Sequence, residues 1–139
     1  MVSKTFTGVD LHSKIQAKIV EWSRRMAATG VIPCLALLHS NLTGAKLTRG
    51  GFQWGVLVAE GALAGIPDLH LPVPSPLGYN SMYVELKTPL SPKLRTAQKK
   101  VINILKEYNN YVVVINGSDE FEALEDFKVE IATYLNLCI

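Results

Sequence analysis

Two acids and a lysine in the middle of the chain have the types and spacing that metal-assisted phosphate chemistry requires. Asp68 directly follows Pro67, and Glu85 and Lys87 stand two residues apart in the run from Met82 to Lys87. Side chains alternate between the two faces of a β-strand, so Glu85 and Lys87 are expected on one face. A carboxylate and an ammonium group would then point the same way.

The segment between the two acids predicts how they meet. Asp68 opens a second apolar run, and residues 74–81 are rich in Pro, Ser, Gly and Asn, the residue types of turns. A hairpin would bring Asp68 beside Glu85. Two converging carboxylates suit a hard cation such as Mg²⁺, which takes oxygen ligands and keeps water and phosphate oxygens in its shell. Lys87 would orient or help to deprotonate the attacking water and would neutralise charge on the phosphate.

A plainer interpretation of these residues stays open. A Glu-x-Lys pair on a strand is often the solvated face of a half-buried sheet, and Pro-Asp is a common turn dipeptide. Neither piece is specific alone. Their conjunction, at about the separation of one hairpin, favours a functional site.

The motif lies within a longer ordered series of residues. The series comprises residues 12–16, Trp22, 38–41, 59–68, 84–87, 90–92, Gln98, 111–114 and 134–135. Taken together, it resembles the VRR-NUC group of the PD-(D/E)xK nucleases. The resemblance implies a restriction-endonuclease-like α/β fold with a mixed central β-sheet flanked by helices. It also implies hydrolysis of DNA phosphodiester bonds with Mg²⁺ or Mn²⁺ as the cofactor.

The resemblance assigns a role to each matching position of the motif. Asp68 and Glu85 would hold the metal, together with the backbone carbonyl of Leu86. Lys87 would be the catalytic lysine. Gln98 would be the glutamine that follows the motif on the next helix, although its amide could instead be a buried structural hydrogen-bonding group.

The sequence departs from the group in its first helix. Members usually carry a glutamate a few residues before the glutamine that matches Gln16, and this chain has Asp10 and His12 there. At about 100° per residue, His12 shares a face with Gln16, whereas Asp10 falls nearly opposite. His12 is therefore the expected substitute as a metal ligand, and imidazole favours Mn²⁺ over Mg²⁺. A hydrogen-bonded helix-start residue remains the alternative for His12, and Asp10 is expected as the N-cap.

Basic residues near the motif predict contact with DNA. The net charge is only +2, so the distribution of basic groups carries more information than their sum. Arg24 and Arg25 are expected to form a solvated helix face. The expected phosphate contacts are Lys46, Arg49, Lys93, Arg95, Lys99 and Lys100.

The substrate is expected from the resemblance alone. Standalone members of the group are similar to junction-cleaving enzymes that act as homodimers, and small versions are frequent in phages. A Holliday junction or other branched DNA is the expected substrate, and a homodimer the expected assembly. A sequence-specific or nicking endonuclease of the restriction or homing type is one alternative. A non-catalytic nucleic-acid-binding or inhibitory module is the other.

Length and composition predict one nuclease domain over residues 1–139. With 48% hydrophobic residues, the chain can form one sizeable core and is too short for two typical domains. No apolar run reaches membrane-spanning length, and the first residues do not resemble a secretory signal. Cys34 and Cys138 are expected to be reduced core residues, which favours an intracellular, cytoplasmic protein without membrane contact.

Apolar spacing predicts the elements that would position the amino-terminal part of the site. A helix over residues 10–28 should end at Gly30 and Pro33, a buried strand should follow at 34–39, and residues 43–51 should form a loop. A short helix is expected at 52–60. The inward positions of the first helix are Ile15, Ile19, Trp22 and Met26.

The second half is expected to alternate helix and strand. Ser91 and Pro92 should begin a helix, residues 111–115 should form a strand parallel to that of Glu85 through a right-handed crossover, and Ser118 should cap a last helix. The expected inward positions are Leu94, Val101, Leu105 and Tyr108 on the first of these helices, and Phe121, Leu124, Phe127, Ile131 and Leu135 on the second. The whole order predicts an α/β sandwich around a mixed sheet.

Overall fold

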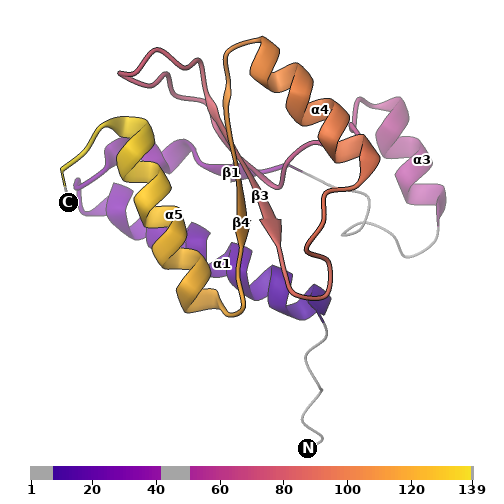
Figure 1. The fold of residues 1–139 in the computed structure, drawn as a ribbon, viewed down its shortest axis with the longest axis horizontal. Coiled ribbons are helices and arrows are strands. Elements are labelled where there is room, and N and C mark those ends of the chain that lie inside the picture. The colour runs from indigo at the N-terminus through magenta and orange to yellow at the C-terminus, as the bar shows by residue number, and fades with distance from the viewer. Residues whose placement is uncertain (1–7, 42–50, 139) are drawn as a thin grey trace, which may run out of the picture.

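The computed structural model describes residues 8–41 and 51–138, and Figure 1 shows the arrangement of their elements. The elements are α1 (Gly8–Ala28), the 3₁₀ helix η1 (Pro33–Leu37), β1 (His39–Ser40), α3 (Gly51–Ala59), β2 (Leu69–Leu71), β3 (Met82–Lys87), α4 (Thr96–Glu107), β4 (Tyr111–Asn116) and α5 (Glu120–Leu135). No helix in this part of the chain is long and apolar enough to cross a membrane.

The strands form one mixed sheet in the order β1-β2-β3-β4. β1 and β2 are antiparallel, as are β2 and β3, whereas β3 and β4 are parallel. The predicted hairpin and the predicted parallel pair are therefore both confirmed. A parallel pair needs a crossover connection, and α4 supplies it between β3 and β4.

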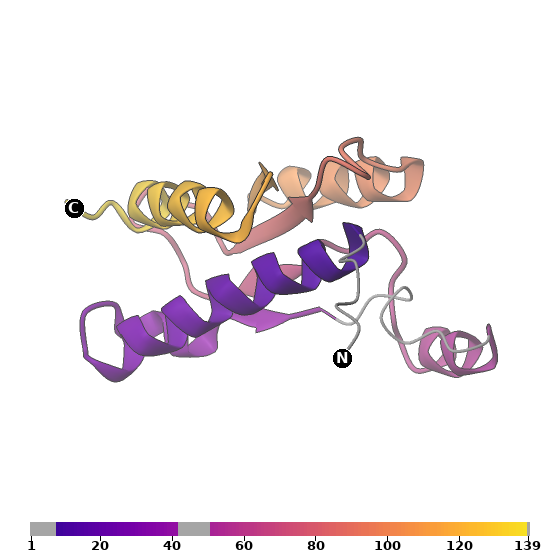
Figure 2. The same ribbon diagram turned by 90° about the horizontal axis from the view of Figure 1, so that it is seen from below.

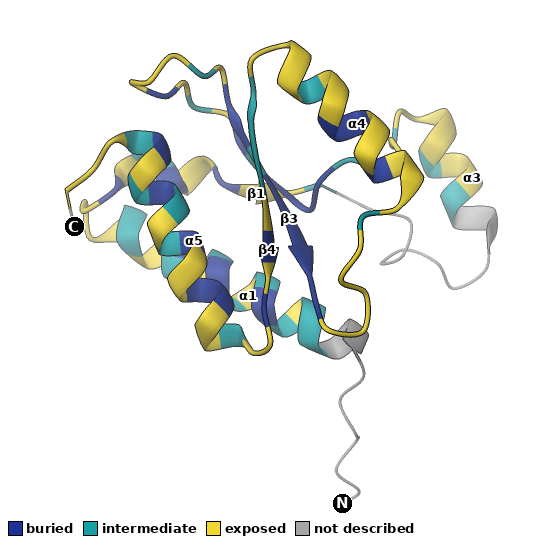
Figure 3. Cartoon of the chain, viewed as in Figure 1, coloured by how far each residue is buried: buried dark blue, intermediate teal, exposed yellow. Residues whose placement is uncertain are grey.

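The main core lies between the sheet and two helices. In Figure 1, α1 and α5 lie on one side of the strands and α4 on the other, and Figure 2 shows α1 extended along the sheet. Buried residues line the inner sides of α1 and α5 and most of β3 (Figure 3). The core residues on these elements are Ile15, Ile19, Met82, Val84, Leu86, Ala123, Leu124, Phe127, Ile131 and Tyr134. The predicted α/β fold with a mixed sheet flanked by helices is confirmed.

The first helix follows its expected stripe and differs at its start. Ile15 and Ile19 are buried, and Gly30, with a φ of 78°, follows the helix as expected. The prediction that Asp10 is the N-cap is wrong, because the helix already includes Gly8 and Val9.

The predicted buried strand at residues 34–39 is wrong. Residues Pro33–Leu37 form a 3₁₀ helix, and only His39–Ser40 pair with β2. Leu35 and Leu38 are buried while Leu37 between them is exposed, which is the three-residue period of a 3₁₀ turn. A short apolar run without alternation does not distinguish these two structures.

Arg24 is not simply solvated, contrary to the sequence interpretation. Its Nη1 donates hydrogen bonds to the backbone carbonyls of Leu35 and Ala36, at 3.2 and 3.1 Å. It therefore ties α1 to the end of η1, where the Leu35 carbonyl also accepts a hydrogen bond from the Leu38 N–H. Arg25 pairs with Glu21 on the helix surface, at 3.9 Å.

The helix after the motif starts later than predicted. Ser91 donates its N–H to the carbonyl of Thr88, so residues 88–91 form a turn and α4 begins only at Thr96. Val101 is buried as expected, whereas Tyr108 is 71% exposed and is not an inward position.

The last helix is capped by Asp119, not by Ser118. The Asp119 carboxylate accepts hydrogen bonds from the N–H groups of Phe121 and Glu122, and a carboxylate also suits the positive end of the helix. Phe121 is exposed, so the inward face starts at the buried pair Ala123 and Leu124.

The remaining expectations concern the short helix at 52–60, the loop at 43–51 and the two cysteines. The short helix α3 is confirmed, and the expected loop at 43–51 lies outside the described residues except for Gly51. Both cysteines are free, as expected. Cys34 packs at the edge of the core, whereas Cys138 is exposed and is not a core residue.

Candidate active site

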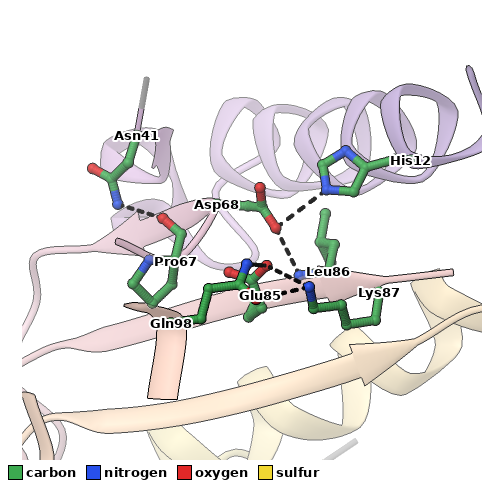
Figure 4. Close-up of polar contacts among 8 residues, drawn as sticks. All are labelled: His12, Asn41, Pro67, Asp68, Glu85, Leu86, Lys87 and Gln98. Atoms are coloured by element: carbon green, nitrogen blue, oxygen red, sulfur yellow. Dashed lines mark hydrogen bonds and ion pairs between the residues drawn. The ribbon is translucent and has the colours of Figure 1, made fainter. Parts of the chain in front are cut away.

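The β2–β3 hairpin places the two predicted acids side by side. Leu69 pairs with Val84, so Asp68, one residue before β2, lies opposite Glu85. One oxygen of Asp68, Oδ2, accepts a hydrogen bond of 2.8 Å from the backbone N–H of Leu86 (Figure 4). The predicted meeting of Asp68 with Glu85 is confirmed, and the contact with β3 fixes the orientation of the Asp68 carboxylate.

Glu85, Lys87 and Gln98 form one buried polar cluster. Gln98, in the first turn of α4, donates from Nε2 to Glu85 Oε1 at 2.9 Å and accepts from Lys87 Nζ at 2.9 Å. Its Oε1 also accepts from the backbone N–H of Arg95, which anchors the amide to the start of the helix. Lys87 Nζ lies 3.8 Å from Glu85 Oε1. The single amide of Gln98 therefore orients both the acid and the base (Figure 4).

Burial excludes the plainer interpretation of the Glu-x-Lys pair. Glu85 is 3% exposed and Lys87 is 5% exposed, so neither belongs to a solvated sheet face. Charged groups are almost never fully buried unless they are paired, and a buried ion pair gives little net stability. The cluster is therefore better explained by function than by folding.

The electrostatics of the cluster favour an additional positive charge. Burial, reinforced by the neighbouring Asp68 carboxylate, raises the pKa of Glu85 to about 8, against the opposing effects of Lys87 and Arg95. The second oxygen of Glu85, Oε2, is buried and makes no hydrogen bond to any described residue. A divalent cation beside Asp68 would give this oxygen a partner and would favour the ionised carboxylate. The two acids thus fit a cation of the Mg²⁺ type.

Comparison with known proteins identifies the fold. No family model matches the sequence, and no curated protein matches it either. A solved structure named "VRR_NUC domain protein" superposes with a TM-score of 0.69 at 21% sequence identity, over 91% of this chain and 89% of that one. The chain has the VRR-NUC fold. At this identity the likeness establishes the fold, as the sequence resemblance implied, and the chemistry rests on the geometry of the site.

Within the VRR-NUC fold, α1 brings His12 to the acid pair. His12 Nε2 lies 3.2 Å from Asp68 Oδ2, and its side chain is 23% exposed. In the described part of the chain, no three His, Cys, Asp or Glu side chains converge as a complete set of metal ligands. Two carboxylates still suit Mg²⁺, because this ion usually keeps several waters and takes few protein ligands. Ligation by His12 and by the carbonyl of Leu86 stays a prediction.

Asn41 is a positioning residue that the sequence interpretation missed. Its Nδ2 donates to the carbonyl of Pro67 at 2.9 Å, and its backbone N–H donates to the carbonyl of Asp68 at 2.8 Å. Asn41 follows β1 directly, so it clamps the Pro67–Asp68 backbone to the edge of the sheet. The only sequence signal for this role was that Asn41 ends the 38–41 segment, which is part of the resemblance to the VRR-NUC group.

Gly65 is the second residue whose role was missed. Its φ is +88°, and a Cβ added there would lie 2.9 Å from the backbone nitrogen of Gln98 and closer still to the backbone carbonyl of Ala97. Only glycine lets the backbone before Asp68 pack directly on the first turn of α4. This contact sets the distance between the two segments that carry Asp68 and Gln98.

The predicted DNA-binding residues lie around the start of α4 where they are described. Lys93, Arg95 and Lys99 are exposed, and the charge of Arg95 acts on Glu85. Lys100 is also exposed, but it stands about 200° around the helix from Gln98 and lines an apolar hollow with Val101 and Ile104. Lys46 and Arg49 lie outside the described residues.

Proposed function

We propose that this protein is a divalent-metal-dependent endonuclease that hydrolyses phosphodiester bonds in DNA. One observation carries the proposal: two adjacent acids, a lysine and a glutamine form a buried, hydrogen-bonded cluster on a VRR-NUC fold. The pKa of Glu85 is raised, and strongly shifted pKa values cluster at functional sites.

Each side chain of the cluster has a distinct task. Asp68 and Glu85 would hold the cation, and a bound divalent cation would supply polarisation of the scissile phosphate and a water of lowered pKa. Lys87 has three N–H donors, and its contact with Gln98 uses one of them. The remaining donors are available to orient the attacking water and to stabilise negative charge on the phosphate.

Gln98 acts on the reaction through its neighbours. Because it donates to Glu85 and accepts from Lys87, rotation of its amide would break both contacts at once. Gln98 therefore keeps Lys87 from a closer ion pair with Glu85 and leaves the ammonium group directed towards the substrate. His12 contributes either as a ligand or by holding Asp68, and the imidazole favours Mn²⁺.

DNA is the proposed partner and a branched structure the proposed substrate. Exposed basic residues before and within the first turn of α4 supply phosphate contacts beside Glu85. The preference for a Holliday junction and the homodimeric state rest on the resemblance to standalone VRR-NUC proteins.

The proposal is tested by cleavage of labelled junction, flap, single-stranded and linear duplex DNA in Mg²⁺ and in Mn²⁺. Lys87→Met and Glu85→Gln should each lower the rate by at least about 100-fold, the lower range for removing an acid–base or charge-stabilising group. The matched control is Lys106→Met, an exposed lysine at the far end of α4, which should cleave normally. Thermal unfolding of each variant checks folding.

Three results would refute parts of this proposal. Equal cleavage by the Lys87→Met variant would remove the catalytic assignment. Cleavage of linear duplexes at one site, with junctions untouched, would favour a sequence-specific or nicking enzyme. DNA binding without cleavage in either metal would favour a non-catalytic module.

A further inference from the structure

Three aromatic rings cross the sheet next to the acid pair. His39 on β1, His70 on β2 and Tyr83 on β3 occupy directly paired positions in the sheet. The rings of His70 and Tyr83 stack with centroids 4.1 Å apart and planes 12° apart, and His39 meets His70 edge to face at 5.2 Å. We call these three residues the ring row.

The ring row shares a sheet face with the proposed catalytic acids. His70 lies two residues after Asp68, and Tyr83 lies two residues before Glu85. Since side chains alternate along a strand, each ring points to the same side as the acid on its strand. At about 3.3 Å per residue, the ring row is about 6.6 Å from the acid pair.

Hydrogen bonds hold the central ring of the row in one orientation. Asn110 donates from Nδ2 to the Leu105 carbonyl, which directs its Oδ1 to the hydroxyl of Ser81 at 2.7 Å. The Ser81 hydroxyl must donate its one proton to that oxygen, so it accepts from His70 Nε2, 3.1 Å away. These hydrogen bonds fix the orientation in which the His70 ring stacks on Tyr83.

The outer ring of the row remains accessible. His39 is exposed, and its Nδ1 lies 3.0 Å from the Leu37 carbonyl, which accepts a hydrogen bond from this nitrogen. That bond holds the ring in place, and the exposure of the residue leaves part of the ring accessible to a ligand. His70 and Tyr83, behind it, are half-buried.

The chemistry of the ring row suits a nucleobase and not a phosphate. The row and its supporting residues Ser81 and Asn110 include no lysine or arginine, and the nearest charges along the strands are the two acids. A phosphate would be repelled there. Flat aromatic surfaces instead stack on bases, and this stacking tolerates any base because each has a π-face.

We infer that the ring row binds an unpaired nucleobase next to the scissile phosphate, with His39 stacking directly on the base. The inference rests on the proposed nuclease function and adds a reason for substrate choice. A paired base is stacked within its duplex and costs a few kcal/mol to extrude, whereas an unpaired base costs less. Among branched DNAs, the ring row therefore favours those with unpaired nucleotides at the cleavage site over a fully paired Holliday junction, for which the expected preference rests on the resemblance alone.

The test measures equilibrium binding in Mg²⁺, with all proteins carrying Lys87→Met so that cleavage does not interfere. Three DNAs are compared: a duplex with a three-nucleotide bulge, the same duplex with abasic sites in the bulge, and a fully paired duplex. His39→Ala should weaken binding of the base-bearing bulge by about 5- to 150-fold, the effect of losing one stacked base. It should leave binding of the abasic bulge and of the paired duplex unchanged.

Two further variants make the result specific. His39→Phe keeps an aromatic ring and should retain the preference for the base-bearing bulge. Tyr108→Ala removes an exposed ring that lies just after α4 and outside the ring row, and it should change none of the three affinities.

Equal affinity for the base-bearing and abasic bulges would overturn the inference, as would a His39→Phe variant that behaves like His39→Ala. A uniform loss of affinity for all three DNAs in His39→Ala would also overturn it. If the wild-type protein cleaves DNA and His39→Ala has no selective effect, only the inference fails. If base-selective binding is found without any cleavage by the wild-type protein, base binding by the ring row stands, whereas the nuclease function and the placement beside a scissile phosphate fail.

Discussion

Replacing Gln98 with methionine tests whether the buried amide holds the cluster together. Methionine has nearly the same length and shape as glutamine, so the substitution removes the polar atoms without leaving a large cavity. Gln98 is 5% exposed, and water has little access to the groups that it contacts. The variant therefore isolates the hydrogen bonds from the packing.

The expected cost follows from the three contacts that are lost. The contact with Lys87 Nζ, at 2.9 Å, involves a charged group and contributes about 1.5–3 kcal/mol. The contact with Glu85 Oε1, also at 2.9 Å, contributes about 0.5–1.5 kcal/mol, because Glu85, with a pKa of about 8, retains its proton at neutral pH without metal. The third leaves the Arg95 N–H without its acceptor. Lys87 and Glu85 are already 3.8 Å apart and can approach each other, which recovers part of the loss. We expect Gln98→Met to lower the free energy of unfolding by about 3 kcal/mol.

Urea denaturation without divalent metal measures this loss. A lower urea midpoint at an unchanged m-value would show that the variant has a lower free energy of unfolding and that the compactness of the unfolded state has not changed. Asn103→Met, at an exposed position of the same helix, is the matched control and should cost less than about 0.5 kcal/mol. A double-mutant cycle with Lys87→Met should give a coupling energy of about 1 kcal/mol or more.

A cost of Gln98→Met no larger than that of the control variant would show that the buried amide does not hold the cluster together. Simple addition of the effects of Gln98→Met and Lys87→Met would show the same, because the two side chains would then contribute independently. In that case the hydrogen bond between them would not be the element that orients the lysine.

Three other predictions follow from the same geometry. Gly65→Ala should destabilise the protein by at least about 1 kcal/mol more than Gly78→Ala, because both glycines have a positive φ but only an added Cβ at Gly65 meets backbone atoms; equal costs in urea denaturation would refute this. Without metal, stability should fall by up to about 1.4 kcal/mol per unit as pH rises from about 4.5 to 8, because the folded state holds the Glu85 proton that the unfolded chain releases. Glu85→Gln should flatten this dependence, and an unchanged slope would contradict the raised pKa. His12→Glu should raise Mg²⁺-supported cleavage relative to Mn²⁺-supported cleavage, whereas an unchanged ratio in both His12→Glu and His12→Ala would show that His12 does not select the metal.

The hairpin was predictable because strand alternation and turn composition are local properties of the sequence. Residues 74–81 contain turn-forming residues, and the run after them places Glu85 and Lys87 on one face whatever the rest of the chain does. The pairing of Leu69 with Val84 then follows from closing the hairpin. Gln98 was located by the resemblance, because no local signal distinguishes a catalytic amide from a buried structural one.

The contacts that complete the site depend on segments far apart in the sequence. Asn41 contacts Pro67, 26 positions later in the sequence, and Gly65 contacts Ala97. No periodic pattern in the sequence links either pair. The error at residues 34–39 has a related cause. Leu35 and Leu38 are apolar because α1 covers them. A buried 3₁₀ turn and a buried strand therefore both appear in the sequence as an uninterrupted apolar run.

Element boundaries failed where a nearby polar residue made a better contact than the predicted cap. Ser118 and Asp119 both suit an N-cap, but the Asp119 carboxylate accepts two backbone N–H groups and moves the start of α5 by one residue. After Lys87, the turn from Thr88 to Ser91 shifts the start of α4 to Thr96. That shift places Gln98 in the first turn of the helix, where its side chain can reach both β3 and the Arg95 N–H.

The charges of the cluster explain why it should engage DNA only with a cation present. When both acids are ionised, Asp68 and Glu85 contribute two negative charges against the one buried positive charge of Lys87, while the Arg95 charge acts from the exposed side. A phosphate approaching this site would meet a net negative charge at low dielectric, where repulsion is strong. Burial raises the pKa of Glu85 and the negative charge of Asp68 raises it further, so without a cation the Glu85 carboxyl group retains a proton. A divalent cation would replace that proton and reverse the local sign, so cation binding and phosphate binding should be coupled at this position.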